Sequence, residues 1–255
     1  MTRKEMAKSK KKRILISQAE PVNKSAYEVL GSRFGAEVTF RPFFKAEPLT
    51  SREFRAQRIN ISEYTAVVFT SRNAIDAFFS LCEQLRVTVP DTMKYFCSSE
   101  AVAMYLQKYI VLRRRKVFFG NGKTDSIVGQ IGQKHCGEKF LIATSGASNN
   151  DSLSEAFADA GLSFTTAVFL KPVSQDLRDI NPSDYDLMVF YNPADIRSLK
   201  ENFPDFNPDG IRFMTYGKHI VQAMEEAGLP IAVKAPTPEA PSVAKALELY
   251  LQDNP

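Results

Sequence analysis

Short apolar runs alternate along the chain with stretches in which apolar residues recur at helical spacing. The helical spacing is clear at Ala74, Phe78, Leu81 and Leu85, which fall on one face of a predicted helix. Alternation of short strands with helices is typical of parallel sheets that carry helices on both faces, so we predict an α/β fold. The runs predicted as strands are Ile14–Ser17, Val38–Phe40, Ala66–Phe69, Tyr95–Cys97, Val117–Phe119, Phe140–Ala143, Leu187–Phe190, Phe213–Tyr216 and Ile231–Val233.

The two halves of the chain resemble each other at a nearly constant offset. Residues around Leu15 and Phe43 match residues that lie 126 positions later in the chain. Residues around Tyr64 match residues that lie 121 positions later. A third block, Phe96–Met104, parallels Tyr216–Met224 at an offset of 120. This repeat predicts two similar α/β units of about 120 residues each.

Two extended stretches, Arg41–Thr50 and Ser163–Gln175, occupy equivalent places in the two halves. Each mixes apolar residues with lysine and proline after a helix that ends in glycine. We interpret them as segments that link the two units, and we expect the binding site in a cleft between the units.

Composition agrees with a globular protein: 44% of the 255 residues are hydrophobic and 24% are charged. No apolar run approaches the roughly 20 residues that span a bilayer, and Ile14–Ile16 is too short for a signal-peptide core. We therefore expect a cytoplasmic protein without membrane contact. The formal net charge of +4 comes from the tail Met1–Arg13, which carries +6, so the rest carries −2. We interpret residues 1–12 as a solvated basic tail and predict no nucleic-acid-binding domain.

The sequence offers little for a metal or an organic cofactor. Cys82, Cys97 and Cys136 lie far apart, and His135 and His219 are the two histidines. Without paired metal-ligand spacings we predict no metal site, and we interpret all three cysteines as small buried residues. No GxGxxG motif follows a strand, and the stretch from residue 120 to residue 124 lacks the first glycine of a phosphate loop, so no cofactor is predicted.

Small polar clusters recur where a predicted strand passes into a helix. One interpretation is that their Ser, Thr and Asn side chains simply cap the helices. Together, however, they would lie at the carboxyl ends of parallel strands, where helix N-termini favour carboxylates and phosphates. The second interpretation is therefore a site for a small polyanion, to which Lys45, Arg72, Lys171 and Lys218 add positive charge. The clusters are Thr70-Ser71-Arg72-Asn73, Ser98-Ser99, Thr144-Ser145-Gly146, Tyr191-Asn192-Pro193-Ala194 and Gly217-Lys218-His219.

These clusters and their order resemble the uroporphyrinogen-III synthase family from Arg13 to Leu251. The residues from Val67 to Ser71, with Ala74, resemble the FTSxxA segment of the family, and Phe190 with Asn192-Pro193 resembles its second copy. Further similar elements are Gly217 with Ala223, Met224 and Gly228, and the turn Ala235-Pro236-Thr237-Pro238.

The resemblance implies an interleaved topology. Residues 13–45 and 174–255 would form the first lobe and residues 50–163 the second. Residues 41–49 and 164–173 would be the connecting strands, and the site would lie in the cleft between the lobes.

The resemblance also implies a hydro-lyase that closes linear hydroxymethylbilane to uroporphyrinogen III, with inversion of the terminal ring and loss of water. The enzyme would use no metal or organic cofactor, act as a monomer, and receive its polycarboxylate substrate from hydroxymethylbilane synthase.

The resemblance and the strand-end clusters together give the candidate site. The family's linker tyrosine aligns with Leu170, and its conserved polar residues align with Glu100, Ser145 and Ile220. The proton donors left near the site are Tyr216, His219 and Tyr191, of which we favour Tyr216 or His219. The expected substrate-binding residues are Thr70, Ser71, Arg72, Asn73, Ser98, Ser99, Ser145, Gly146, Lys171, Asn192, Pro193, Ala194, Gly217 and Lys218.

Two other functions fit the same pattern. A homologue with weakened catalysis could bind a polyanion without turnover, and a two-lobed cytoplasmic protein could bind an unrelated small molecule. The product of a hydroxymethylbilane assay distinguishes the three.

Overall fold

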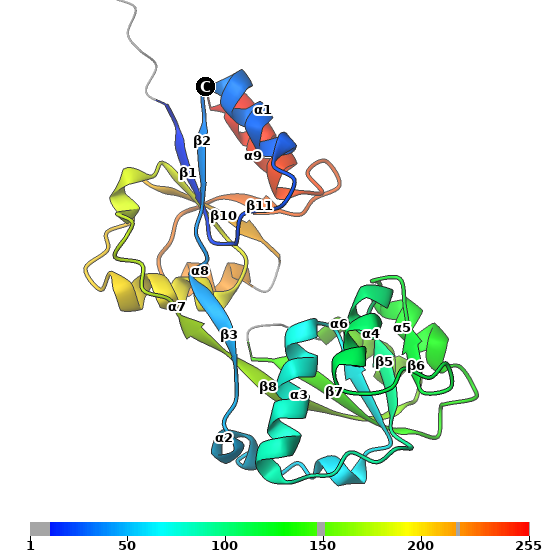
Figure 1. Cartoon of the computed structure of the whole chain (residues 1–255). Helices are drawn as coiled ribbons and strands as arrows, with labels where there is room; N and C mark the ends of the chain where they lie inside the picture. The colour runs from blue at the N-terminus through cyan, green and yellow to red at the C-terminus, as the bar shows by residue number, and fades with distance from the viewer. Residues whose placement is uncertain (1–10, 147–150, 218–219, 255) are drawn as a thin grey trace, which may run out of the picture. The chain divides into compact units, whose positions relative to one another are not determined.

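The chain divides into two compact units in a computed structural model that describes residues 11–146, 151–217 and 220–254 (Figure 1). Unit 1 combines the N-terminal part of the chain, up to Lys45, with the C-terminal part from Ser174. Unit 2 is the intervening segment Ala46–Val173. Within the described residues, no helix is both long enough and apolar enough to cross a bilayer.

Unit 1 is built on a sheet of five strands in the order β11-β10-β9-β1-β2, in which every pairing is parallel. Strand β9 lies next to β1, although more than 160 residues separate them in the sequence. The elements of this unit are β1 (Arg13–Ile16), α1 (Ser25–Phe34), β2 (Glu37–Phe40), η3 (Pro182–Asp184), β9 (Leu187–Phe190), α7 (Pro193–Asn202), β10 (Arg212–Tyr216), α8 (Val221–Glu226), β11 (Ile231–Ala235) and α9 (Val243–Asp253).

Unit 2 contains a sheet in the order β3-β8-β7-β4-β5-β6. The pairings among β8, β7, β4, β5 and β6 are parallel. The elements are β3 (Phe44–Pro48), α2 (Ser51–Arg55), η1 (Ile61–Glu63), β4 (Ala66–Phe69), α3 (Arg72–Leu85), β5 (Lys94–Cys97), α4 (Glu100–Tyr105), η2 (Leu106–Lys108), β6 (Val117–Phe119), α5 (Thr124–Ile131), β7 (Lys139–Ser145), α6 (Asp151–Asp159) and β8 (Ser163–Ser174).

Strand β3 differs from the other strands of its sheet in direction. The amide of Leu49 donates to the carbonyl of Phe169, and the amide of Gln175 donates to the carbonyl of Phe43, both at 2.9 Å. Residue numbers thus rise along one strand as they fall along the other, so β3 and β8 are antiparallel.

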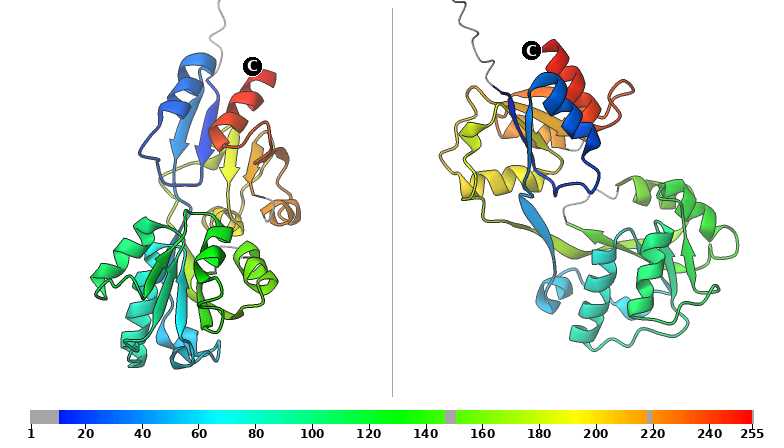
Figure 2. Two further views of the ribbon diagram at one scale, coloured as in Figure 1. Left: turned by 90° about the vertical axis from the view of Figure 1, so that its right-hand side faces the viewer. Right: turned by 45° about the horizontal axis from the view of Figure 1, so that its top comes forward.

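The predicted α/β fold with parallel sheets is confirmed, and each apolar run that we predicted as a strand lies in one, except that Ser17 follows the end of β1. The reason is the alternation of side chains between the two faces of a strand. In β1, Ile14 and Ile16 pack on the side of α1 and α9, whereas Leu15 packs with residues of α7 and α8. Figure 2 shows α1 and α9 side by side.

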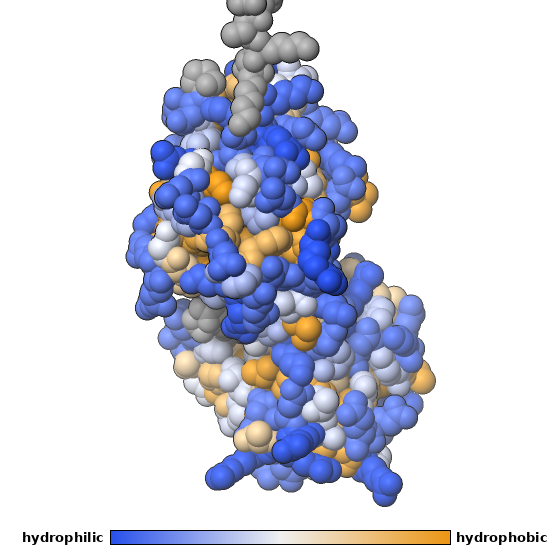
Figure 3. Space-filling view, turned by 90° about the vertical axis from the view of Figure 1, so that its left-hand side faces the viewer, coloured by the Kyte–Doolittle hydropathy of each residue, from blue (hydrophilic) through white to orange (hydrophobic). Residues whose placement is uncertain are grey.

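Unit 2 has the same two-sided packing. Val67 and Phe69 of β4 belong to the cluster that contains Phe78 of α3, and Val68 belongs to the cluster that contains Phe157 of α6. Helices therefore cover both faces of the sheet. The face of the molecule seen in Figure 3 is mainly hydrophilic, with apolar residues in groups between the polar ones.

The prediction that all three cysteines are buried is wrong for Cys136. Cys82 and Cys97 are buried, but Cys136 is exposed in the turn between α5 and β7. Its thiol donates to the carbonyl of Gln133 at 3.1 Å. The neighbouring His135 occupies the buried position of this turn instead.

Replacing Phe78 by alanine tests the packing of unit 2. Its ring is fully buried and contacts Phe69, Phe79 and Phe169, so we expect a loss of about 3–5 kcal/mol in the free energy of unfolding. Phe119→Ala is the matched control, because this ring is 40% exposed, and it should cost less than about 1 kcal/mol. Urea denaturation measures both, and equal losses would contradict the packing described.

Candidate functional site

The predicted polar clusters of unit 2 lie at one edge of its sheet. Strand β4 pairs in parallel with β5 and with β7, so the carboxyl ends of the three strands meet there. The Ser98 hydroxyl, after β5, donates to the carbonyl of Thr70, after β4, at 3.1 Å. Ser145 ends β7 at the same edge. The structure thus brings together three clusters that lie far apart in the sequence.

Several of these side chains also cap helices, as the first interpretation predicts. The hydroxyl of Ser71 accepts the amide of Ala74 at 3.2 Å and so begins α3. Ser99 holds the equivalent place before α4, but its side chain makes no capping bond. Arg72 and Asn73 follow the cap and are exposed. The Arg72 guanidinium lies 5.6 Å from the centroid of the Tyr105 ring and forms no ion pair with any residue that the structure describes.

Lys171 follows Leu170, the residue of β8 that lies opposite Ser145, and already has an anionic partner. Its ammonium lies 2.5 Å from a carboxylate oxygen of Glu53. Hydrogen bonds from Lys171 and from Thr50 hold the pKa of Glu53 at about 2. A substrate carboxylate would therefore compete with Glu53 for Lys171, whereas Arg72 has no such competitor among the described residues.

The end of β7 is joined to β8. The amide of Gly146 donates to the carbonyl of Leu170 at 2.8 Å, and Ser145 lies opposite Leu170 in the register. Leu170 itself is buried in the core of unit 2. Because this side chain is apolar and packs in the core, it offers no acid group at the position that aligns with the family's linker tyrosine. Glu100 is exposed at the start of α4.

Unit 1 has an equivalent edge, formed by the ends of β1, β9 and β10. Asn192 begins α7, and its side-chain oxygen accepts the amide of Ala194 at 2.9 Å, with Pro193 in the first turn. Gly217 follows β10, and its amide donates to the carbonyl of Ala235 at 2.7 Å. Lys218 and His219 lie outside the described residues. Ile220 is buried at the start of α8.

Tyr191 and Tyr216 contact each other at this edge, with ring centroids 5.4 Å apart. The Tyr216 hydroxyl donates to the carbonyl of Pro241 at 3.0 Å. Burial, followed by the neighbouring Tyr27, Tyr216 and Asp195, raises the pKa of Tyr191. Its phenol is therefore a weaker acid than an ordinary tyrosine, although it remains a hydrogen-bond donor at neutral pH.

Sequence reasoning missed Asp195, which is fully buried in the first turn of α7. One carboxylate oxygen accepts the amides of Tyr191 at 2.9 Å and Asn192 at 3.0 Å. Burial raises the pKa of Asp195 to about 6, although these amides lower it. The signal was present in the sequence, because Asn192 and an acidic residue three positions later form a capping box.

Three buried oxygens near these strand ends, Ser17 Oγ, Asp195 Oδ1 and Thr215 Oγ1, make no well-aligned hydrogen bond to a described residue. The Ser17 hydroxyl nevertheless lies close enough to the Asp195 carboxylate to lower its pKa. Ser17 directly follows β1, and Thr215 lies in β10 opposite Phe190. Buried oxygens of this kind are commonly satisfied by ordered water. The described residues contain no group of three His, Cys, Asp or Glu placed to hold a metal ion.

One family model matches most of the chain, and solved structures are similar to the chain in fold. The family model described as uroporphyrinogen-III synthase HemD matches residues 25–245. Uroporphyrinogen-III synthetase from Helicobacter pylori is similar in structure, with a TM-score of 0.55 at 16% identity over 95% of this chain and 100% of that chain. A mutant form of uroporphyrinogen III synthase from Thermus thermophilus has a TM-score of 0.47 at 14% identity. The match covers 94% of this chain and 98% of that chain. The curated proteins contain no match.

A pH series on the variant Asp195→Asn tests the buried carboxyl. The ordinary pKa of an aspartate is 3.8, and that of Asp195 in the folded protein is about 6. Between these two pH values the folded protein holds a proton on Asp195 that the unfolded chain has released. The free energy of unfolding should therefore fall as pH rises through this window, by up to about 3 kcal/mol in total. The asparagine keeps an acceptor oxygen but has no such proton, so this part of the decline should vanish.

Urea denaturation from pH 4 to pH 7 measures the difference between the wild type and this variant. Other carboxyl groups titrate equally in both proteins and cancel. Parallel curves for the two proteins would show that Asp195 is not the group that titrates in this window.

Proposed function

The chain belongs to the uroporphyrinogen-III synthase family, and from that premise we propose that strand-end clusters of this chain hold hydroxymethylbilane while it closes to uroporphyrinogen III. The observation that carries the function is the family match over residues 25–245. It makes the chain an enzyme of tetrapyrrole biosynthesis that acts on a linear tetrapyrrole. The finer assignment, a hydro-lyase, follows from the loss of water in this reaction.

The reaction needs a proton donor and a surface that fixes the substrate conformation. The C–O bond to the terminal hydroxyl breaks, the hydroxyl takes a proton and leaves as water, and a cationic azafulvene remains. The cationic carbon bonds to the substituted α-carbon of the terminal ring and gives a spiro-like intermediate. The original C–C bond at that α-carbon then breaks, the released carbon bonds to the free α-carbon of the same ring, and the proton on that carbon leaves. Because unguided closure gives the isomer without inversion, the enzyme's main contribution is to position the ends of the chain.

The substrate carries eight carboxylates, which suit the ends of parallel strands. Helix N-termini there present backbone amides and a partial positive charge. We assign Thr70, Ser71, Arg72 and Asn73 to one set of carboxylates, with Arg72 as the principal cation because no carboxylate pairs with it among the described residues. The other binding residues that we propose are Ser98, Ser99, Ser145, Gly146, Lys171, Asn192, Pro193, Ala194, Gly217 and Lys218.

We propose Tyr216 or His219 as the proton donor to the leaving hydroxyl, with Tyr191 as the third candidate. Tyr216 and Tyr191 are in contact at the strand ends of unit 1, and the raised pKa of Tyr191 makes its phenol a weaker acid, which is why it ranks third. Asp195 would position this pair, since it accepts the amide of Tyr191.

The family also leads us to propose that the enzyme is a cytoplasmic monomer that receives hydroxymethylbilane from its synthase. Sedimentation of the purified protein tests the first point, and a single species of about twice the chain mass would overturn it.

Incubation with freshly generated hydroxymethylbilane tests the proposed function. After oxidation, uroporphyrin III should predominate over the type I isomer that forms without an enzyme. If folded protein yields only type I at the uncatalysed rate, the chain does not catalyse this reaction.

Separate variants identify the proton donor. Removing the true donor, by Tyr216→Phe, Tyr191→Phe or His219→Ala, should lower kcat by about 10²–10⁴-fold. Tyr185→Phe is the control, because Tyr185 precedes β9 at the opposite edge of the same sheet and should retain full activity. Full ring-inverting activity in all three variants would exclude the assigned donors.

A further inference from the structure

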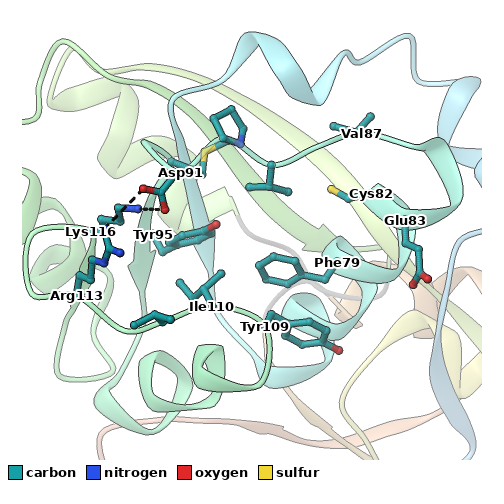
Figure 4. Close-up of a pocket in the computed structure, with 14 residues that line it drawn as sticks. Phe79, Cys82, Glu83, Val87, Asp91, Tyr95, Tyr109, Ile110, Arg113 and Lys116 are labelled. Atoms are coloured by element: carbon teal, nitrogen blue, oxygen red, sulfur yellow. Dashed lines mark hydrogen bonds and ion pairs between the residues drawn. The ribbon is translucent and has the colours of Figure 1, made fainter.

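Unit 2 contains a cavity of about 460 Å³ that is separate from the strand-end clusters (Figure 4). Its lining includes Met93 and Lys116, which directly precede β5 and β6. The cavity therefore lies at the amino ends of these parallel strands, whereas Ser98 and Ser99 lie at the carboxyl end of β5. Its volume falls in the range of small-molecule sites, about 300–1,000 Å³.

Aromatic rings form much of the wall. Phe79 and Tyr109 are stacked, with centroids 4.4 Å apart and planes 6° from parallel, and Tyr95 lies 6.3 Å from Phe79. Val89 and Ile110 add aliphatic surface. A wall of this kind favours a flat, apolar ligand, because ring faces and edges pack well against other rings.

Hydrogen bonds outside the cavity fix one of these rings. The Tyr109 hydroxyl donates to Asp76 at 2.5 Å, and the same carboxylate accepts from Tyr105 and Lys108, both at 2.8 Å. The ring of Phe79 is stacked on that of Tyr109, so the fixed Tyr109 ring also holds Phe79 in place. Because the wall is ordered before a ligand arrives, binding costs little side-chain entropy.

One buried polar group points into this apolar space. Tyr95 is only 2% exposed, and its hydroxyl makes no hydrogen bond to a described residue, but its oxygen is not sealed from solvent. Figure 4 shows this hydroxyl directed into the cavity. Burial raises the pKa of Tyr95, so the phenol keeps its hydrogen. A ligand with an acceptor atom would take the hydrogen bond of this hydroxyl in place of water.

The rim carries two basic residues, Lys116 and Arg113, and two acidic residues, of which Asp91 is easily displaced. Lys116 lies 2.5 Å from Asp91, and Arg113 lies 3.7 Å from the same carboxylate. The Lys116 side chain is 12% exposed, whereas that of Asp91 is 85% exposed and can swing into solvent. Arg114 and Arg115 follow directly, and Glu83 is the other acidic residue of the lining. A ligand anion can thus replace Asp91 beside Lys116.

We infer that this cavity is a second ligand site, for a small planar aromatic anion such as an aryl carboxylate. The ring lies against Phe79 and Tyr109, a polar atom of the ligand accepts from Tyr95, and the carboxylate pairs with Lys116 and Arg113. This inference does not rest on the synthase reaction, because none of these residues belongs to the strand-end clusters.

Titration with 2-naphthoate tests the inference on the full chain. The chain has no tryptophan, so the fluorescence of the naphthoate can be followed without interference. We expect saturable binding of one equivalent, and binding at least tenfold weaker for the uncharged 2-naphthol. No saturable binding in the millimolar range, or equal affinity for the two probes, would overturn the inference.

Matched variants then locate the site. Lys116→Gln should weaken 2-naphthoate binding about tenfold or more, whereas Arg114→Gln removes the same charge outside the cavity lining and should change it less than about twofold. Val89→Phe should abolish binding by filling the cavity. Circular dichroism confirms that each variant folds. Equal effects of the two charge variants, or full binding by folded Val89→Phe, would place the probe elsewhere.

Discussion

The direction of the strands is the constraint on which this molecule depends. Parallel strands place all their carboxyl ends at one edge of the sheet, and the following helices begin there with unpaired amides. In unit 2 this brings the Ser98 hydroxyl to the carbonyl of Thr70, and in unit 1 it brings Tyr191 to Tyr216. A polycarboxylate can then be held by backbone amides and few cations, which explains why the body of the chain has no large positive charge.

Much of the fold could be predicted from local pattern. Val67, Val68 and Phe69 are all buried because both faces of a parallel sheet are covered, and such runs are visible as uninterrupted apolar sequence. The caps Ser71 and Asn192 are also local, since each bonds an amide two or three residues away. Such features need no knowledge of distant contacts.

The parts that were missed depend on neighbours in space. The carboxylate that compensates the charge of Lys171 belongs to Glu53, which lies more than 100 residues earlier in the chain. Cys136 resembles a buried residue by type alone, and only the turn shows that His135 takes the interior position. The aromatic cavity joins Phe79, Tyr95 and Tyr109 from three segments whose sequence suggests only ordinary core packing. Asp195 is the exception, because its capping box could have been found by spacing.

Amide hydrogen exchange with and without uroporphyrinogen III tests most directly whether strand ends hold the tetrapyrrole. The account predicts slower exchange in peptides that cover residues 70–74, 98–101 and 191–195, at the starts of α3, α4 and α7. It predicts no change in the segments 87–93 and 109–116, which contribute most of the residues that line the aromatic cavity. Protection confined to those two loops, or none at the strand ends under saturating product, would contradict it.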